Sequence, residues 1–204
     1  QIGDTVTVTI TAANNEAGLT LSSKTFNGQT LTNVTDQNNG TYTATYTVVE
    51  GDAKVADGGS VTTDLGFTDA AGNVGAKTTS VTLGGESIDA TKPTISAVSI
   101  TDAAMNIDDV VTATITVGNA TGETLSLSSG SIGGFALSNL SKTNDTTYTA
   151  QFTVTDGGTD VASGADIPVS LVLADPSGNA SDTFTTAISQ ASDAIDANAP
   201  TIAS

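Results

Sequence analysis

The stretch Tyr42-Thr43-Ala44-Thr45-Tyr46-Thr47-Val48 alternates apolar side chains with threonine, and it returns 106 residues later as Tyr148-Thr149-Ala150-Gln151-Phe152-Thr153-Val154. A period of two residues indicates a β-strand with one buried face and one solvated face. The same offset carries Asp69-Ala70-Ala71-Gly72-Asn73 onto Asp175-Pro176-Ser177-Gly178-Asn179. A period of this length corresponds to a whole domain. The sequence therefore predicts two tandem modules.

Further alternating segments flank this strand and are separated by Gly-Asn, Asn-Gly and Gly-Gly turns. Short alternating segments with such turns are typical of an antiparallel β-sandwich. In the second module we place seven strands near residues 94–101, 109–117, 124–129, 135–140, 146–155, 166–174 and 181–189. This density is immunoglobulin-like. The predicted fold class is therefore all-β, with tandem Ig-like sandwiches of about seven strands.

The two modules begin at different strands of the repeat. Pro93-Thr94-Ile95 opens the first strand of the second module, whereas Gln1-Ile2-Gly3-Asp4 aligns with a second strand. We therefore expect module 1 at residues 1–89, lacking its first strand, module 2 at 90–196, and the start of a third module's first strand at 197–204. This predicts a fragment of a longer array, with an open sheet edge in module 1 where another strand can add.

The composition limits the chemistry of these modules. Five Lys+Arg residues stand against 22 Asp+Glu residues, for a net charge of −17, which argues against nucleic acid or an anionic membrane as a partner. The absence of His and Cys removes the usual catalytic base, the thiol nucleophile and the common zinc and copper ligands. No apolar run is long enough to cross a bilayer. We expect a monomer that does not insert into membranes and is not an enzyme.

Acidic and amide side chains gather in the predicted loops. The candidate metal ligands are Asp4, Glu50, Asp52, Asp57, Asp69, Asp89, Asp102, Asp109, Asp156, Asp160, Asp175, Asn179 and Asp196. Strand polarity places the loops before strands two and six at one pole of a sandwich and the loop before strand seven at the other. The linker residue Asp89 leaves module 1 at the pole with the loops before strands two and six, and it enters module 2 at the pole with the loop before strand seven. Asp89 is therefore predicted to lie between the acidic loops of module 1 and Asp175 with Asn179 of module 2.

Crowded carboxylates repel one another, and a dication removes that cost. Oxygen ligands in flexible loops suit calcium better than magnesium, with an affinity of roughly 10⁻⁴–10⁻³ M for extracellular modules. The alternative is that these residues cap their own turns and keep the surface soluble. Asp89 and Asp196 share an Ile-Asp-Ala context, and together with the loop from Asp156 to Asp166 they are the strongest candidates for a ligand role.

Four motifs together resemble the bacterial Ig-like repeats of very large RTX-type surface adhesins. They are Ile107-Asp108-Asp109-Val110-Val111, the segment from Tyr46 to Gly58, the two Asp-x-x-Gly-Asn turns, and the linker Asp89-Ala90-Thr91-Lys92-Pro93-Thr94. The resemblance implies Ig-like extenders, stacked in arrays with calcium at the joints, that hold a ligand-binding domain away from a Gram-negative outer membrane. The second module departs from the pattern at Asp108 and at Gly157-Gly158, where Gly and Gly-Asp are usual.

Three functions can be compared with this sequence: an extender, an adhesive module and a glycoside hydrolase. An extender needs only a stiff, soluble rod linked by calcium, and this is the function that we expect, on the bacterial cell surface and in biofilms. An adhesive or carbohydrate-binding module is the alternative, but it needs exposed aromatic residues, and the Tyr and Phe positions fall mostly on predicted inward faces. A glycoside-cleaving carboxylate pair is the third, but the predicted poles offer no evident cleft.

Overall fold

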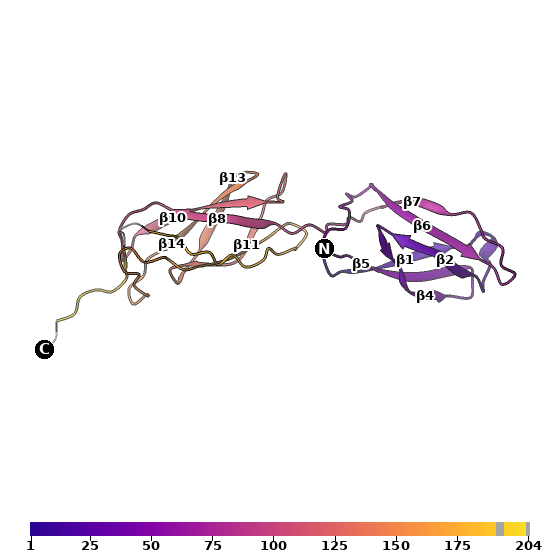
Figure 1. The fold of residues 1–204 in the computed structure, drawn as a ribbon, viewed down its shortest axis with the longest axis horizontal. Coiled ribbons are helices and arrows are strands. Elements are labelled where there is room, and N and C mark those ends of the chain that lie inside the picture. The colour runs from indigo at the N-terminus through magenta and orange to yellow at the C-terminus, as the bar shows by residue number, and fades with distance from the viewer. Residues whose placement is uncertain (191–193, 203–204) are drawn as a thin grey trace. The chain divides into compact units, whose positions relative to one another are not determined.

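The computed structural model describes residues 1–190 and 194–202, and the chain divides into two compact units, residues 1–91 and 92–204. Each unit is a sandwich of two β-sheets (Figure 1). The predicted all-β, tandem Ig-like fold class is thereby confirmed. None of the described helices is long and apolar enough to cross a membrane.

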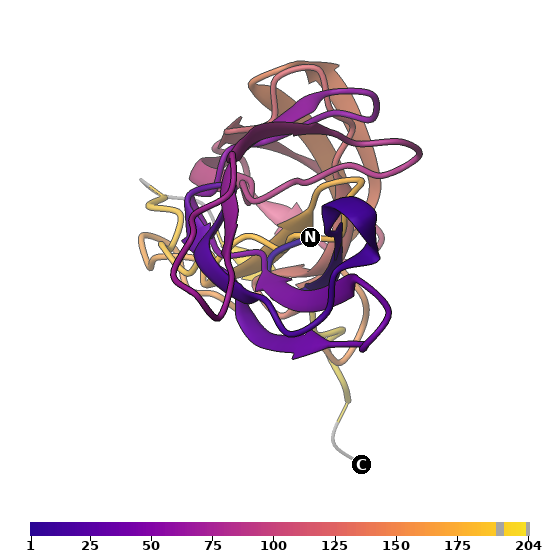
Figure 2. The same ribbon diagram turned by 90° about the vertical axis from the view of Figure 1, so that its right-hand side faces the viewer.

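The first unit has a three-stranded sheet and a four-stranded sheet. The three-stranded sheet has the order β1-β5-β4 and the other has the order β3-β2-β6-β7. The strands are β1 (Thr5–Thr11), β2 (Thr20–Phe26), β3 (Gln29–Thr30), β4 (Thr32–Asp36), β5 (Thr41–Thr47), β6 (Ser60–Thr68) and β7 (Thr78–Thr82). A 3-10 turn, η1 (Ala13–Asn15), follows β1 and is visible as a coiled indigo ribbon in Figure 2.

The second unit repeats this plan with one more strand in the first sheet. Its sheets have the orders β13-β14-β10-β8 and β12-β11-β15, and a short parallel pair β16-β9 lies beside them. The strands are β8 (Thr94–Ile100), β9 (Met105–Asn106), β10 (Val110–Gly118), β11 (Ser126–Ile132), β12 (Phe135–Ala136), β13 (Ser138–Asn144), β14 (Thr147–Thr153), β15 (Val169–Ala174) and β16 (Ile195–Asp196).

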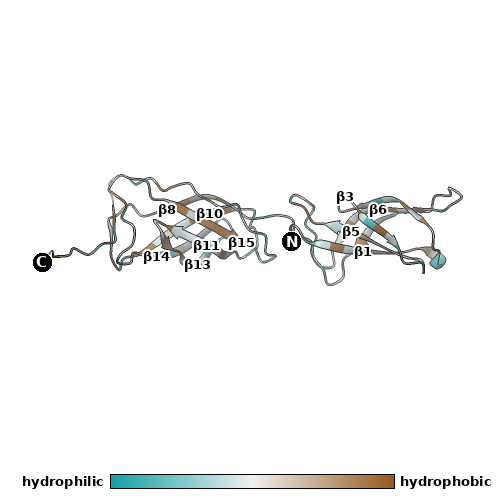
Figure 3. Ribbon diagram, turned by 90° about the horizontal axis from the view of Figure 1, so that it is seen from below, coloured by the Kyte–Doolittle hydropathy of each residue, from teal (hydrophilic) through white to brown (hydrophobic). Residues whose placement is uncertain are grey.

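The alternating pattern sorts side chains between the core and solvent. On β5, Tyr42, Ala44 and Tyr46 are buried, and on β14 the equivalent Tyr148, Ala150 and Phe152 are buried as well. In Figure 3 apolar residues alternate with paler ones along the strands. Because each pair of facing threonines on β1 and β5 points outward in register, one face of that sheet is solvated. Each unit therefore has its own apolar core.

The predicted strand at 135–140 crosses between the two sheets. β12 pairs with β11 in one sheet, whereas β13 pairs with β14 in the other, and the buried Leu137 lies at the crossing. Leu31 occupies the same place in the first unit. Asn33 and Asn139 adopt φ values of 50° and 53° where the register with the neighbouring strand shifts. Asparagine tolerates this left-handed conformation, so it supports the bulge after the crossing.

The last strand expected at 181–189 forms no continuous strand. The segment contacts residues of and just before β15 through isolated bridges between Leu171 and Phe184 and between Ile167 and Ile188. The sequence also gave no indication of the parallel pair of Ile195 with Met105. Residues 197–202 lie outside any strand, and residues 203 and 204, which complete the third-module strand expected at 197–204, lie outside the described residues.

The two units differ at one sheet edge. In the second unit β10 pairs with both β14 and β8. In the first unit β1, the counterpart of β10, pairs with β5 and with no second strand among residues 1–190 and 194–202. Among the described residues, β1 is therefore an edge strand of its sheet.

Candidate metal-binding site

A buried tyrosine places a glutamate at the same pole of each unit. In the second unit the Tyr148 hydroxyl accepts a hydrogen bond from the backbone N–H of Leu125 at 3.0 Å and donates one to the carbonyl oxygen of Glu123 at 3.2 Å. Lys142 also donates from Nζ to that carbonyl at 2.5 Å. Because the carbonyl of Glu123 accepts two hydrogen bonds and the nearby N–H of Leu125 donates a third, the backbone that carries the Glu123 carboxylate is fixed in place.

The first unit has the same arrangement, in which a buried tyrosine hydroxyl joins the backbone of a glutamate and of a following leucine, and we call this arrangement the tyrosine pin. The Tyr42 hydroxyl accepts a hydrogen bond from the backbone N–H of Leu19 at 2.8 Å and donates to the carbonyl oxygen of Glu16 at 3.2 Å. Sequence reasoning did not select either glutamate. The repeat does contain a signal for them, because each glutamate lies two or three residues before the leucine that begins an alternating segment, Leu19 in the first module and Leu125 in the second.

The turn Asp-x-x-Gly-Asn presents a second carboxylate at that pole. In the second unit Asp175 Oδ1 accepts the backbone N–H of Asn179 at 2.9 Å, and Oδ2 accepts the Asn179 side-chain amide at 2.8 Å. Gly178 has φ +94°, a conformation that the tight turn requires and that glycine adopts without strain. The same contacts recur between Asp69 and Asn73. The turn therefore has a structural role, as the alternative interpretation predicted.

Within the second unit, carboxylate oxygens of Glu123 and Asp175 lie within 4.8 Å of each other. Two oxygens that share one calcium ion at 2.3–2.6 Å lie at most about 5 Å apart, so this spacing is compatible with a common calcium ion. Both donors are hard oxygens, the type that calcium and magnesium prefer. These two residues therefore fit a divalent cation, with Asp175 predicted from the sequence and Glu123 supplied by the fold.

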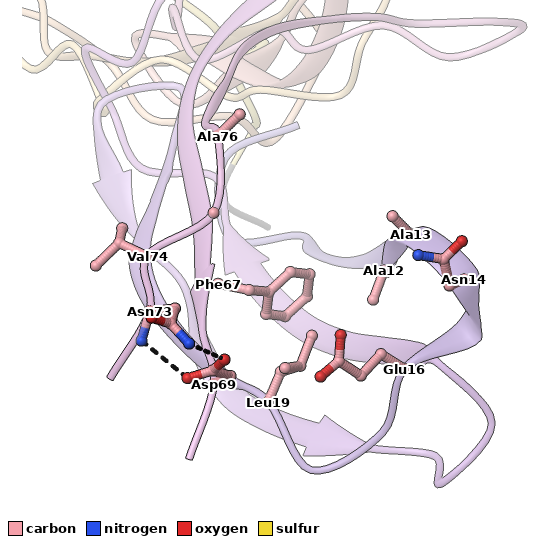
Figure 4. Close-up of a pocket in the computed structure, with 11 residues that line it drawn as sticks. Ala12, Ala13, Asn14, Glu16, Leu19, Phe67, Asp69, Asn73, Val74 and Ala76 are labelled. Carbon is pink, nitrogen blue, oxygen red and sulfur yellow. Dashed lines mark hydrogen bonds between the residues drawn. The ribbon is translucent and has the colours of Figure 1, made fainter. Parts of the chain in front are cut away.

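The equivalent pole of the first unit is a shallow pocket of about 390 Å³. Figure 4 shows Phe67 and Leu19 on its floor, with the carboxylates of Asp69 and Glu16 along it. The side-chain hydrogen bond from Asn73 is the main cause that lowers the pKa of Asp69 below its ordinary 3.8. Asp69 is therefore ionised at neutral pH, and the pocket is acidic.

Asp52, at the opposite end of β5, belongs to a buried polar network. Its Oδ2 accepts the Tyr46 hydroxyl at 2.6 Å and the backbone N–H of Val49 at 2.9 Å, and its Oδ1 accepts the Gln29 amide at 2.7 Å. Asn27 donates from Nδ2 to the same hydroxyl at 3.1 Å. With three donors already on its two oxygens, Asp52 acts as an internal hydrogen-bond acceptor in this structure.

Burial and these contacts shift two pKa values. Burial by itself raises the pKa of Asp52, but the hydrogen bonds from Tyr46, Val49 and Gln29 together hold it below 3.8. Burial, followed by the hydrogen bond to Asp52, raises the pKa of Tyr46 to about 12. The pair is therefore a neutral phenol donating to a carboxylate across the neutral range.

The second unit replaces this polar network with aromatic packing. Phe152 stands in place of Tyr46, Gly158 in place of Asp52 and Phe135 in place of Gln29. The rings of Phe135 and Phe152 stack with centroids 6.1 Å apart. A Cβ atom added at Gly158 would lie 2.5 Å from the Phe135 ring, so glycine is required there. The two units thus hold the same loop by different chemistry.

The remaining acidic loops mostly bind their own backbone. Asp160 Oδ1 accepts the backbone N–H of Ala197 and the amide of Asn198, both at 2.8 Å, and Asp156 Oδ1 accepts the N–H of Ala199 at 3.3 Å. Asp57 accepts the N–H of Gly85 at 2.7 Å. These carboxylates fasten the segment that ends each unit onto the loop before the last long strand.

Other predicted ligands cap short turns or are exposed. Asp196 and Asp109 accept backbone N–H groups two and three residues away, at 3.2 and 2.7 Å. Asp4 lies 2.8 Å from the amino group of Gln1. Glu50 and Asp102 are exposed on loops.

Asp89 has a basic partner, which the sequence argument did not foresee. Lys54 Nζ lies 2.9 Å from Asp89 Oδ2, and the backbone N–H of Thr91 donates to Oδ1 at 3.2 Å. A lysine therefore already offsets the charge of this carboxylate, a role that the sequence analysis assigned to a dication alone. The reason is that the bridge between Val55 and Ile88 brings the Lys54 loop alongside the end of the unit.

Comparisons with known proteins agree with the geometry of the first unit. Residues 1–84, which lie within the first unit, match the family model of the bacterial Ig-like domain. No curated protein matches this sequence significantly.

Among solved structures, the fibronectin(III)-like modules of Clostridium thermocellum CbhA are similar at 13% identity and a TM-score of 0.37, over 93% of this chain and 87% of that chain. The Escherichia coli adhesin FdeC is similar at 19% identity and a TM-score of 0.33, over 93% of this chain and 60% of that chain. Yersinia pseudotuberculosis InvD is similar at 23% identity and a TM-score of 0.29, over 93% of this chain and 53% of that chain.

Proposed function

We propose that this chain is a non-catalytic spacer segment of a bacterial cell-surface adhesin, in which tandem Ig-like modules project a distal ligand-binding domain. The observation that carries this proposal is the repetition itself. Residues 1–84 match the bacterial Ig-like domain, and the second unit repeats the sheets, the tyrosine pin and the Asp-x-x-Gly-Asn turn of the first. A spacer requires independent, soluble modules in series, and each unit has its own apolar core and an acidic surface.

The proposal includes calcium as the ion that stiffens the joint between modules. Glu123 and Asp175 support it, because their spacing and their hard oxygens fit a calcium ion. We propose Asp89 as a further ligand, because it precedes the second unit by only three residues, a stretch that spans about 10 Å. The ion would have to compete with Lys54 for that carboxylate.

Small-angle scattering and thermal unfolding, each with and without millimolar calcium, test this proposal. We expect calcium to extend the particle and to raise the melting temperature, since an ion that binds only the folded state stabilises it. Glu123→Gln should weaken calcium binding by about tenfold or more, the loss expected for one charged ligand worth at least about 1.4 kcal/mol. Its fold should persist because the backbone carbonyl, not the carboxylate, contacts Tyr148.

Two further variants sharpen the test. Glu16→Gln in the first unit is the matched control, and it should leave calcium binding at the joint unchanged. Lys54→Met should strengthen binding, because it removes the cation that competes for Asp89. If scattering and melting are the same with calcium, with magnesium and with a chelator, calcium has no role, and only the spacer function remains.

An adhesive module is the second candidate, and the pocket at the pole of the first unit favours it. An apolar floor at Phe67 and Leu19 beside the carboxylates of Glu16 and Asp69 is a suitable surface for a small polyol or cation. Binding of a glycan panel to the wild-type chain, with loss on Phe67→Ala, would support this function in place of the spacer.

A further inference from the structure

One segment near the end of the second unit, residues 194–199, is bound along its length to the body of that unit, and we call it the exit segment. It contains β16 (Ile195–Asp196), which pairs in parallel with β9 (Met105–Asn106). On its other side Ile195 exchanges two backbone hydrogen bonds with Val161, both at 2.9 Å. The side chains of Ile195 and Ala197 are 1% and 0% exposed, so the exit segment is part of the core.

Two carboxylates also hold the exit segment. Asp160 Oδ1 accepts the backbone N–H of Ala197 and the side-chain amide of Asn198, both at 2.8 Å. Asp156 Oδ1 accepts the backbone N–H of Ala199 at 3.3 Å. The bonded residues lie 37 to 43 positions apart in the sequence. These contacts therefore tie the exit segment to a distant loop of the same unit.

The first unit holds its own last segment by equivalent backbone contacts. Ile88 exchanges hydrogen bonds with Val55 at 2.8 and 2.9 Å, and the carbonyl of Ala90 accepts the N–H of Gly51 at 3.0 Å. The carbonyl of Ala197 accepts an N–H in the same way at 2.8 Å. Ala90 is fully buried, as Ala197 is. The docking of this segment is therefore a feature of both units.

The direction of the strands decides how tension acts on the exit segment. The chain enters the second unit before β8 and β9 and leaves it after β16, at the opposite end of the sandwich in Figure 1. Tension therefore pulls β9 toward its start and β16 toward its end. Because the two strands are parallel, these pulls are opposite and lie along the strands, so the hydrogen bonds between them are loaded together. An antiparallel pair pulled apart from one end would instead open one bond at a time.

We propose that the exit segment is a force-bearing contact that keeps the second unit folded when the chain is stretched, with Asp156 and Asp160 securing the segment against sliding. Sliding of β16 along β9 would pull Ile195 and Ala197 out of the core and would break the bonds to both carboxylates at the same time. This role rests on the proposed spacer function only for its biological use, because a spacer between two surfaces carries tension.

Without the exit segment the load would fall on fewer contacts. The preceding segment, residues 181–189, forms no continuous strand, and it meets residues of and just before β15 through isolated bridges such as those of Phe184 and Ile188. A unit held only through that segment should therefore unfold sooner under the same force. This difference separates a force-bearing contact from one that merely adds stability.

Single-molecule pulling at constant force on the complete chain tests the proposal. The chain has no cysteine, so introduced cysteines are unique attachment points, and Thr94→Cys at the exposed start of β8 provides the first. Ile202→Cys as the second point loads the exit segment, whereas Ser189→Cys, at an exposed position before it, leaves it unloaded. We expect the unit to survive about tenfold longer or more when it is held at position 202, the effect of a few additional hydrogen bonds.

Variants at one carboxylate show whether the contact carries the load. Asp160→Ala removes the acceptor of two hydrogen bonds, so it should shorten the lifetime about tenfold or more in the chain held at position 202. It should change the lifetime less than about twofold at position 189, because bonds that stay intact in the transition state do not affect the unfolding rate. Asp160→Asn keeps an oxygen in place of Oδ1 and should stay within about threefold of the parent chain. Asp166→Ala, at an exposed position in the same loop, is the matched control and should have no effect.

Three results would overturn the proposal. The first is a lifetime at position 202 that is equal to or shorter than that at 189, a comparison that requires no change at Asp160. The second is an effect of Asp160→Ala that is the same at both positions, whether large or absent. The third is an early extension of about 4–5 nm, the reach of residues 190–202, which would mean that the exit segment detaches before the unit unfolds. All measurements are made with a chelator present, so the outcome is independent of the calcium joint and of the scattering test of the spacer.

Discussion

Replacing Asp52 by asparagine should destabilise the first unit and leave the second unit unchanged. The two oxygens of Asp52 accept hydrogen bonds from Tyr46, Val49 and Gln29, and Asp52 is 8% exposed. Asparagine has one oxygen and one NH₂ group. Its oxygen can take the place of Oδ2 and accept from Tyr46 and Val49, while its NH₂ group takes the place of Oδ1 and faces Gln29, whose own side-chain amide can turn over and accept through Oε1.

The size of the effect follows from those contacts. Every donor keeps an acceptor, so the cost is the charge assistance that the three hydrogen bonds lose, and a hydrogen bond to a charged group is roughly twice as strong as a neutral one. We therefore expect Asp52→Asn to lower the free energy of unfolding of the first unit by about 1–3 kcal/mol, a sizeable part of the usual total of about 5–15 kcal/mol.

Native-state hydrogen exchange measured by peptide mass spectrometry is the appropriate assay, because it reports each unit separately. Protection should fall in residues 41–48 of β5 and stay constant in residues 147–154 of β14. A change below about 0.5 kcal/mol in the first unit, the level typical of surface substitutions, would refute the assigned role of Asp52.

The second unit provides a rescue experiment for the same reasoning. It holds the equivalent loop with Phe152, Gly158 and Phe135 in place of the polar network. A first unit that carries Asp52→Gly, Tyr46→Phe and Gln29→Phe together should recover at least half of the stability lost in Asp52→Gly alone. Strict additivity of the three changes would contradict the idea that these residues act as one unit.

The remaining predictions concern pH and the second unit. The pKa of Asp52 is lowered below 3.8 in the folded chain, so the stability that it contributes is complete above about pH 5 and is lost as the pH falls through 3.8 towards the lower folded-state pKa. The free energy of unfolding measured between about pH 5 and pH 3 should show this slope, and Asp52→Asn should flatten it. Gly158→Ala should destabilise the second unit by about 1–3 kcal/mol because its Cβ overlaps the Phe135 ring, and an unchanged urea midpoint would refute this. Tyr148→Phe should cost that unit about 1–3 kcal/mol by leaving the N–H of Leu125 without its acceptor, whereas Ser129→Ala on an exposed strand position should cost almost nothing.

The sequence by itself determined the strands and the repeat. Alternation such as that from Tyr42 to Val48 depends only on the two-residue period of a strand, which is local, and recurrence at a fixed offset identifies modules without any knowledge of their contacts. The same reasoning found Asp69, Asp175 and their asparagine partners, because an Asp-x-x-Gly-Asn turn is closed within five residues.

Only the tertiary structure decided which side chains meet. Glu123 lies near Asp175 because Tyr148, from a third segment, fixes its backbone, and Lys54 reaches Asp89 because a bridge aligns two loops. The crossing of strands at Leu31 and Leu137 likewise depends on how two sheets share one core. These contacts join residues about 20 to 50 positions apart, and no local pattern encodes the packing that brings such residues together.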